Sequence, residues 1–197
     1  VANQGADMSA LWLQRHAQPL IAPGVCYGHT DMAADDKATA AAALAMQQAW
    51  ATEGLPPGTV WHSPLQRCEL LSRTLKRLEP NFILKPTTAL VEMDFGCWEG
   101  LRWDDIPRSD IDTWTADFWH YAPGGGESLA CMMARVQAAM AAARAQAQAS
   151  GQPVLWIAHA GVAQCAHWLA TRGDRIPTAK EWPSVKLAYG EWIRLPL

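Results

Sequence analysis

Arginine and histidine side chains gather just after short apolar stretches of the sequence. Arg15 and His16 follow one such stretch directly, and His159 follows another. Arg67 comes five residues after the end of a third. A guanidinium group can bind two phosphate oxygens at once, and a histidine among positive charges stays neutral and therefore nucleophilic. These residue types predict a phosphate site in which His16 attacks phosphorus directly.

The apolar stretches predict buried strands at Leu11–Gln14, Thr59–His62 and Pro153–Ala158. Each is short and is followed by residues typical of loops or helix starts. Two further strands are expected at Phe82–Leu84 and Trp192–Leu195. Near-continuous apolar strands are typical of a parallel sheet, whose ligands bind beyond the carboxyl ends of the strands. The charged residues that follow the strands are therefore expected at one edge of the sheet.

Helices are expected between the strands. They cover Asp35–Thr52, Ser63–Leu78, part of Trp103–Trp119, Ser128–Ala149 and Gly161–Thr171. Ser63 and Pro64 supply an N-cap hydroxyl and a proline at the first helical position, which is typical of a helix start. The alternation of strands and helices predicts an α/β fold with a mostly parallel sheet.

Length and charge limit the classes of protein to consider. The chain has 197 residues, which fits one domain, expected to span residues 8–197. Residues 1–7 lack the basic start and apolar stretch of a secretory signal, so they are interpreted as an N-terminal extension or a cloning remnant. The net charge is −3 and the basic residues are scattered, which argues against nucleic acid as a partner. No apolar run approaches the roughly 18 residues that cross a bilayer, so no membrane partner is expected.

The five cysteines are widely spaced and never form a C-x-x-C pair. Such spacing is typical of reduced thiols and predicts a cytoplasmic protein without a zinc site. No other group of residues has the spacing of metal ligands, so neither a metal nor a cofactor is expected.

Four stretches resemble the signatures of the histidine phosphatase (phosphoglycerate mutase-like) superfamily. In chain order they are Leu13–Ala17, Ser63–Cys68, Glu92–Gly100 and His159–Gly161, which read LQRHA, SPLQRC, EMDFGCWEG and HAG. The resemblance extends from about Leu11 to Trp168 and keeps the order of motifs in that family. It implies a three-layer α/β/α fold with a mostly parallel central sheet.

The resemblance also implies a role for each matched residue. His16 would be the nucleophile that becomes phosphorylated, and Glu92 would give its proton to the leaving alcohol. Arg15, Arg67 and His159 would bind the phosphate, with His159 counted among the catalytic residues as well. Water would then attack the phosphohistidine with Glu92 as the base. The implied activity is that of a metal-independent phosphomonoesterase.

Two positions depart from the family pattern. Ala17 stands where the family usually has glycine, so a methyl group lies beside the nucleophile. Ala22 stands where the family commonly has an asparagine that binds phosphate. Gln18 or His29 is expected to supply that hydrogen bond if it is not lost.

Other conspicuous residues have structural interpretations. His62 and His167 are expected to be structural, and Gly124–Gly126 to form a turn before a helix, since no P-loop lysine follows it. The tryptophans of the segment that builds the substrate lid in the family have two interpretations: packing in the core, or a stacking wall for a flat substrate. They are Trp98, Trp103, Trp114 and Trp119.

The short chain resembles the alpha-ribazole phosphatase-like members of the superfamily more than the mutases. The expected partner is a small-molecule phosphate ester, with alpha-ribazole 5'-phosphate as the first candidate. A phosphatase of another metabolite, a protein-phosphohistidine phosphatase and a phosphate-binding pseudoenzyme remain alternatives. Nothing in the sequence predicts the oligomeric state.

Overall fold

The computed structural model describes residues 10–197, so the extension expected at residues 1–7 lies outside the described part of the chain. Its centre is a five-stranded sheet in the order β3-β2-β4-β1-β5, in which only β5 runs antiparallel to its neighbour. The strands are β1 (Ala10–Arg15), β2 (Thr59–His62), β3 (Ile83–Pro86), β4 (Val154–Ala158) and β5 (Trp192–Pro196). The prediction of a mostly parallel sheet is confirmed.

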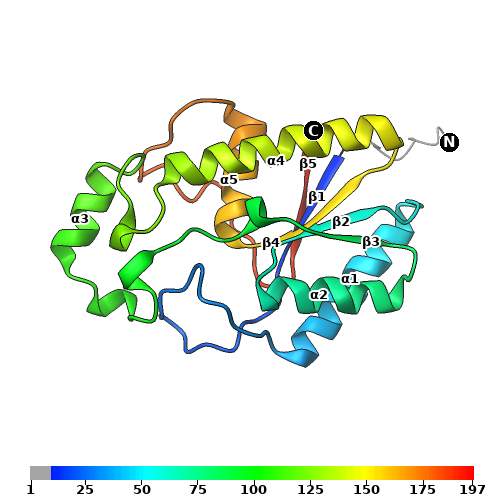
Figure 1. The fold of residues 1–197 in the computed structure, drawn as a ribbon, viewed down its shortest axis with the longest axis horizontal. Coiled ribbons are helices and arrows are strands. Elements are labelled where there is room, and N and C mark those ends of the chain that lie inside the picture. The colour runs from blue at the N-terminus through cyan, green and yellow to red at the C-terminus, as the bar shows by residue number, and fades with distance from the viewer. Residues whose placement is uncertain (1–9) are drawn as a thin grey trace.

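Helices cover both faces of this sheet (Figure 1). They are α1 (Asp36–Thr52), α2 (Gln66–Leu78), α3 (Arg108–Ala116), α4 (Leu129–Ser150) and α5 (Ala160–Arg172). Helices α1 and α2 pack together on one face, whereas α4 and α5 pack together on the other. Helix α3 lies apart from these two layers, together with the short 3₁₀ turns at Gly96–Trp98 and Trp103–Asp105. The expected three-layer α/β/α architecture is therefore present.

The strands are apolar throughout because each face of the sheet has its own core. Side chains of a strand point alternately to opposite faces. Accordingly, Leu13 and Trp156 pack in the core beneath α4 and α5, while Trp12 and Leu155 pack in the core beneath α1 and α2. This two-sided burial explains why the strands read as continuous apolar runs rather than as an alternating pattern.

The register of the sheet brings three strand ends to the same level. Arg15 of β1 pairs with Ala158 of β4, and His62 of β2 pairs with Ile157. The backbone N–H of His16 donates to the Ala158 carbonyl at 2.9 Å, which continues the ladder one residue further. The residues that follow these strands therefore leave the sheet side by side, as the sequence predicts.

A third, smaller core holds the segment between β3 and α4. Trp98 is buried there, and Trp103 and Trp114 pack against it. Trp119 instead packs against the main core under α4 and α5. Core packing thus accounts for all four tryptophans of this segment, and Trp114 has a second contact that is described below.

Two further observations concern the described residues. Every helix within residues 10–197 is too short or too polar to cross a membrane. All five cysteines are free, with Cys97 and Cys131 exposed and the remaining thiols buried. The expected reduced state agrees with this arrangement.

We expect the sheet core to dominate stability, and a matched pair of leucines tests this. Leu13 of β1 is fully buried, whereas Leu20 in the following loop is 63% exposed. Leu13→Ala should lower the free energy of unfolding by about 2–5 kcal/mol, because it leaves a cavity between packed layers. Leu20→Ala should change it by less than about 0.5 kcal/mol. Urea unfolding of both variants measures the difference, and equal losses would contradict the described packing.

Candidate active site

His16 has one ring nitrogen held by the backbone and the other left with its lone pair. Its Nδ1 lies 2.7 Å from the Ala17 carbonyl oxygen. Because a carbonyl oxygen only accepts, Nδ1 must carry the proton, and Nε2 is then unprotonated in the neutral ring. Ala17, which replaces the usual glycine, is itself buried and leaves this contact intact. The geometry presents Nε2 as a nucleophile.

Burial keeps His16 neutral. The imidazole is 1% exposed, and desolvation lowers its pKa from 6.5 to about 3. The hydrogen bond to Ala17 opposes this effect, and the charges of Arg67 and Arg15 add to it. The nucleophilic form is therefore the resting form over the ordinary pH range.

Arg67 is fully buried near the start of α2. Its guanidinium group donates to the carbonyl oxygens of Gly28 at 2.6 Å and Thr30 at 2.8 Å, and through Nε to His159 Nδ1 at 3.3 Å. A guanidinium group has five N–H donors, so these contacts leave donors free for a ligand. The same contacts wrap the loop that contains Gly28 and Thr30 around the charge.

Arg15 stands at the end of β1 and is less completely satisfied. One terminal N–H donates to the Leu187 carbonyl at 2.7 Å, and the guanidinium carbon lies 3.9 Å from the centre of the Tyr189 ring. Its buried Nε has no hydrogen-bond partner. An unpaired buried donor is costly unless a ligand accepts from it, so this atom marks a place for an anion.

His159 is completely buried, and its centroid lies 5.1 Å from that of His16. Its Nδ1 accepts from Arg67, so Nε2 carries the proton and donates to Ser63 Oγ at 2.9 Å. Burial, followed by the charges of His16 and Arg67, lowers its pKa well below 6.5. The prediction that Ser63 caps a helix is wrong, because α2 begins at Gln66 and the Ser63 hydroxyl binds His159 instead.

Glu92 reaches the site from the irregular segment after β3. Its Oε2 accepts from the backbone N–H of Gly161 at 2.9 Å, and its Oε1 accepts from that of Met93 at 2.9 Å. Gly161 lies in the first turn of α5, where the helix dipole favours a negative charge. A Cβ at Gly161 would lie 2.2 Å from Glu92 Oε1, so a glycine is required for this approach.

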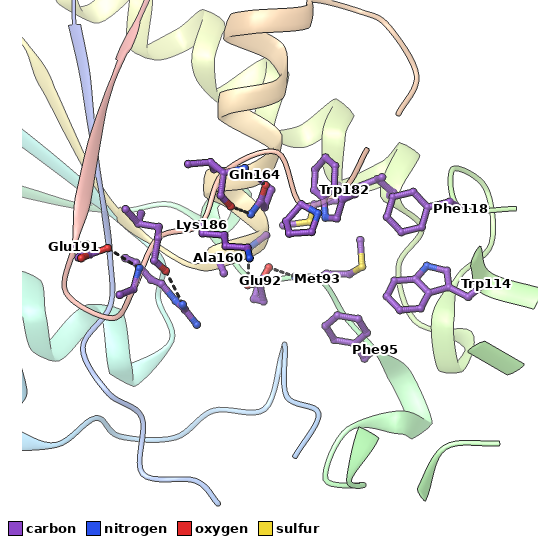
Figure 2. A pocket seen from close by; sticks show the side chains of 18 residues that line it. Glu92, Met93, Phe95, Trp114, Phe118, Ala160, Gln164, Trp182, Lys186 and Glu191 are labelled. Carbon is purple, nitrogen blue, oxygen red and sulfur yellow. Dashed lines mark hydrogen bonds between the residues drawn. The ribbon is translucent and has the colours of Figure 1, made fainter. Parts of the chain in front are cut away.

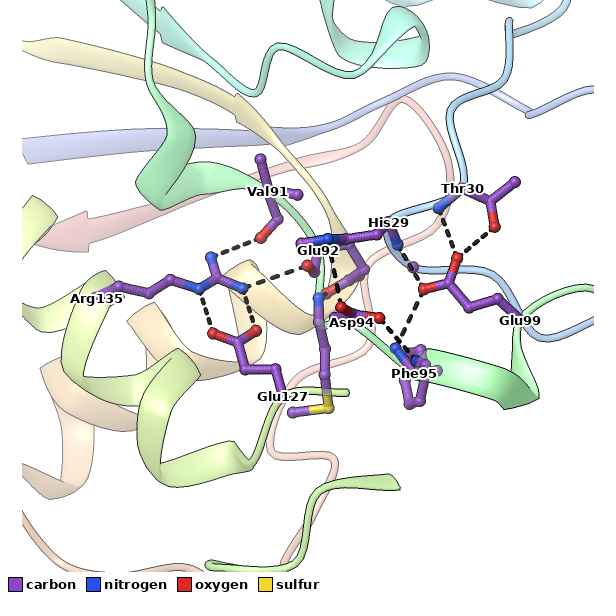
Figure 3. Close-up of polar contacts among 12 residues, drawn as sticks. His29, Thr30, Val91, Glu92, Asp94, Phe95, Glu99, Glu127 and Arg135 are labelled. Carbon is purple, nitrogen blue, oxygen red and sulfur yellow. Dashed lines mark hydrogen bonds and ion pairs between the residues drawn. The ribbon is translucent and has the colours of Figure 1, made fainter. Parts of the chain in front are cut away.

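A partly buried ion pair holds the backbone of the Glu92 segment (Figure 3). Arg135 of α4 binds both carboxylate oxygens of Glu127 at 2.7 Å. The same guanidinium donates to the carbonyl oxygens of Ala89, Val91 and Glu92. Arg135 thereby attaches the segment that carries Glu92 to a long helix.

Arg67 binds carbonyl oxygens of the loop that contains Gly28 and Thr30, and a second carboxylate, that of Glu99, binds N–H groups of the same loop. Glu99 accepts from the backbone N–H groups of His29, Thr30 and Phe95 (Figure 3). Burial raises the pKa of Glu99, but hydrogen bonds from Thr30, His29 and Phe95 outweigh it, so the pKa is lowered overall. The loop is therefore held by two opposite charges, with Arg67 bound to its carbonyl groups and Glu99 bound to its N–H groups.

The two residues suggested as extra phosphate donors lie at the rim. His29 is half exposed and has Nδ1 3.7 Å from Asp94 Oδ2. Gln18 is exposed, and its amide nitrogen lies 3.4 Å from the Pro19 carbonyl. Neither contact involves Arg15 or His16, and their roles in phosphate binding stay predictions.

A cavity of about 690 Å³ opens beside Arg15 and Glu92 (Figure 2). Its far wall is aromatic and is formed by Phe95, Trp114, Phe118 and Trp182. Polar side chains are few and include Gln164, Lys186 and Glu191. Trp114 therefore serves both as packing in the third core and as a wall of this cavity.

Comparison with known proteins decides the family. The sequence profile of the histidine phosphatase superfamily (branch 1) matches residues 11–192. The chain belongs to the histidine phosphatase superfamily. The prediction of a phosphatase of this superfamily is thus confirmed at the level of the family.

Among the proteins that this histidine phosphatase resembles is a curated 6-phosphofructo-2-kinase/fructose-2,6-bisphosphatase of Caenorhabditis elegans. It is 28% identical over 160 residues, which cover 79% of this chain and 33% of that protein. The chain therefore spans about a third of the length of this relative.

Solved structures with the same fold include the alpha-ribazole phosphatase from Shigella flexneri, with a TM-score of 0.75 and 22% identity over 94% of this chain and 89% of that one. The mycobacterial glucosyl-3-phosphoglycerate phosphatase in complex with inorganic phosphate gives a TM-score of 0.71 and 23% identity over 94% of this chain and 88% of that one. At these identities the likeness shows the fold.

Two further histidines of the phosphatase, His62 and His167, make contacts that involve neither His16 nor His159. His62 is buried, with Nδ1 2.9 Å from the Ser63 carbonyl, and His167 Nδ1 lies 3.1 Å from Ser184 Oγ. That these two histidines are structural stays a prediction. Over residues 10–197 no three side chains of the metal-binding types come together as a possible ion site.

Sequence reasoning missed several residues that build the site. Arg135 could have been found most easily from the sequence. A charged residue at the edge of the apolar face of a helix is partly removed from water and therefore needs a partner of opposite charge. Glu99 lies within a quoted motif without a role assigned to it. Tyr27, Tyr189 and Gln164 gave no signal, because their contacts join segments far apart in the chain.

Gly161→Ala tests the placement of Glu92. The new methyl group must displace the carboxylate from the N-terminus of α5, so kcat should fall by a factor on the order of 10 to 100. The affinity for inorganic phosphate should hardly change, because Arg15 and Arg67 are untouched.

Steady-state kinetics and phosphate titration measure the two effects, and Glu92→Gln gives the reference for a lost acid. Thermal unfolding serves as the control, because alanine is favourable inside a helix. An unchanged kcat would show that Glu92 does not act from the position described.

Proposed function

We propose that the protein is a metal-independent phosphomonoesterase that forms a phosphohistidine at Nε2 of His16. The observation that carries the proposal is the buried, neutral His16, whose Nδ1–H is held by Ala17 and whose Nε2 lone pair is left beside two arginines. Such an imidazole needs no base to become a nucleophile. Arg15 and Arg67 supply the positive charge that offsets the charge of a phosphoryl group.

In the first step, the Nε2 lone pair forms a bond to phosphorus while the bond from phosphorus to the alcohol oxygen breaks. Glu92 in its acid form gives its proton to that oxygen, and the alcohol leaves into the adjoining cavity. In the second step, Glu92 takes a proton from water as the water oxygen forms a bond to phosphorus and the bond from phosphorus to Nε2 breaks. Inorganic phosphate leaves, and His16 and Glu92 return to their starting forms.

The wall of the cavity favours a leaving group with a flat apolar part. Trp114, Phe118 and Trp182 line it, and Glu92 lies where it meets the phosphate site. Aromatic side chains stack well on flat rings. Alpha-ribazole 5'-phosphate, which carries a benzimidazole base, is our proposed substrate; the alpha-ribazole phosphatase among the similar structures supports this choice. This substrate would place the enzyme in cobalamin assembly in the cytoplasm.

Other activities receive less support. The relatives named for fructose bisphosphate and glucosyl phosphoglycerate act on sugars, whose many hydroxyl groups would find few polar partners among the residues that line this cavity. A phosphate-binding pseudoenzyme would not need both a poised nucleophile and a placed acid. A protein-phosphohistidine substrate would have to fit a cavity of about 690 Å³.

The phosphohistidine is the most direct test. During turnover of a fast-leaving ester in EDTA, alkaline quenching should preserve one phosphoryl group on the protein. Peptide mapping should place it on His16. His16→Ala should lose both the label and turnover, yet still bind inorganic phosphate through Arg15 and Arg67. Glu92→Gln should lower kcat more than it changes KM.

Three results would refute this mechanism. They are appreciable turnover by His16→Ala, a label on His159, and loss of activity in EDTA that added magnesium or zinc restores. An acid quench serves as a chemical control, because phosphohistidine is stable in base and labile in acid.

The substrate proposal makes a separate prediction. The kcat/KM for alpha-ribazole 5'-phosphate should exceed that for 3-phosphoglycerate, because only the ribazole ester has a flat ring that can stack on the aromatic side chains of the cavity. Trp114→Ala should raise KM for the ribazole ester by about 5- to 10-fold, as expected for a lost stacking contact, and leave that for 3-phosphoglycerate unchanged. The reverse order of kcat/KM would remove this substrate and leave the phosphatase chemistry standing.

A further inference from the structure

Two tyrosines meet above the phosphate site from opposite ends of the chain. The hydroxyl oxygens of Tyr27 and Tyr189 lie 2.8 Å apart, although 162 residues separate them in sequence. Tyr27 lies in the loop after β1 and Tyr189 in the loop before β5, and the antiparallel pairing of β1 with β5 brings these two loops side by side. This hydrogen bond therefore closes a bridge between two loops.

Each tyrosine ring lies on one of the two arginines. The guanidinium carbon of Arg15 is 3.9 Å from the centre of the Tyr189 ring, and that of Arg67 is 5.4 Å from the centre of the Tyr27 ring. Both distances allow attraction between cation and aromatic face. The bridge thus spans the two cations that face the nucleophile.

The Tyr189 ring also covers the nucleophile. Its centroid is 5.5 Å from that of His16, which is only 1% exposed. Tyr189 itself is 37% exposed, so its ring reaches the surface beside the buried imidazole.

The Tyr189 loop is fastened on both sides. Gln164 of α5 accepts from the backbone N–H groups of Ser184 at 2.7 Å and Val185 at 2.9 Å. At the other side, Gly190 N–H donates to the His16 carbonyl at 3.0 Å. With the loop anchored at both ends, the position of the Tyr189 ring is defined by the fold.

We propose that Tyr27 and Tyr189 are positioning residues of the phosphoryl site, which hold Arg15 and Arg67 on either side of His16 and cover its imidazole. The proposal rests on the phosphatase function proposed above. It adds two residues to the machinery that act through the arginines and the nucleophile.

The hydroxyl pair also has a donor to spare. One O–H donates within the pair, and the other is left to donate to a ligand. Burial and the hydrogen bond to Tyr189 raise the pKa of Tyr27, against the opposing charges of Arg15 and Arg67. Tyr27 therefore stays uncharged and keeps its O–H as a donor.

A double-mutant cycle tests the bridge with inorganic phosphate as the probe. Tyr27→Phe and Tyr189→Phe keep the rings and remove the shared hydrogen bond, so each should weaken phosphate binding by about 3- to 10-fold in calorimetry. The double variant should bind phosphate with the same affinity as the single variant that binds it less tightly. Each single substitution already removes the hydrogen bond between the two tyrosines, so the second has no bond left to remove. Tyr121→Phe, which changes the remaining tyrosine in the separate aromatic core, should bind as the wild type does.

Tyr189→Leu tests the cover. With the ring gone, water reaches His16, and its pKa should rise by at least about one unit towards 6.5. Arg15, Arg67 and His159 still face the imidazole and oppose a complete return. An NMR titration of the His16 ring, assigned with His16→Gln, measures the change, and Tyr189→Phe should keep the low pKa.

The outcomes separate this proposal from the phosphatase mechanism. Unchanged phosphate affinity in all Phe variants, multiplying effects in the double variant, or an unchanged His16 pKa in Tyr189→Leu would overturn the role of the bridge. Phosphate binding that follows the expected cycle, in a protein that forms no phosphohistidine, would overturn the mechanism and support the bridge.

Discussion

A guanidinium group without exposure to solvent organises this site. A buried charge is costly unless hydrogen bonds replace its water, and Arg67 obtains them from the carbonyl oxygens of Gly28 and Thr30 and from His159. This requirement shapes the loop after β1, because its carbonyls must turn inward. Because Arg67 donates to Nδ1 of His159, the proton of that ring lies on Nε2, which donates to Ser63 Oγ.

The residues around Arg67 come from two kinds of structure, the ends of sheet strands and irregular segments. The ends of three parallel strands present His16, Ser63 and His159 at one level, where the register of the sheet leaves little freedom. Glu92 comes from an irregular segment, and Arg135 attaches that segment to α4. The cavity beside Glu92 is lined by residues of α3, α4 and α5 and of the irregular segments between elements, and such segments can differ among members of one superfamily.

Much of the architecture follows from local physics. Short apolar runs such as Pro153–Ala158 predict buried strands, because a sheet covered on both faces has no polar side. Helix positions follow from spacing and caps, although α2 begins later than its serine suggests. The strand order and the antiparallel β5 could not be predicted, since they depend on which edges remain free after the other strands have paired. The membership of the superfamily was predictable as well, because four motifs appear in order along the chain.

The sequence by itself determined which residues we predict to carry the chemistry, since Arg15, His16, Arg67, Glu92 and His159 stand in recognisable local contexts. Only the tertiary structure decided how they are held. The tautomers of both histidines, the close approach of Glu92 to Gly161, and the pairing of Tyr27 with Tyr189 arise between segments that are distant in the chain. Such contacts depend on the path of the backbone through space, and no local pattern of residue types records that path.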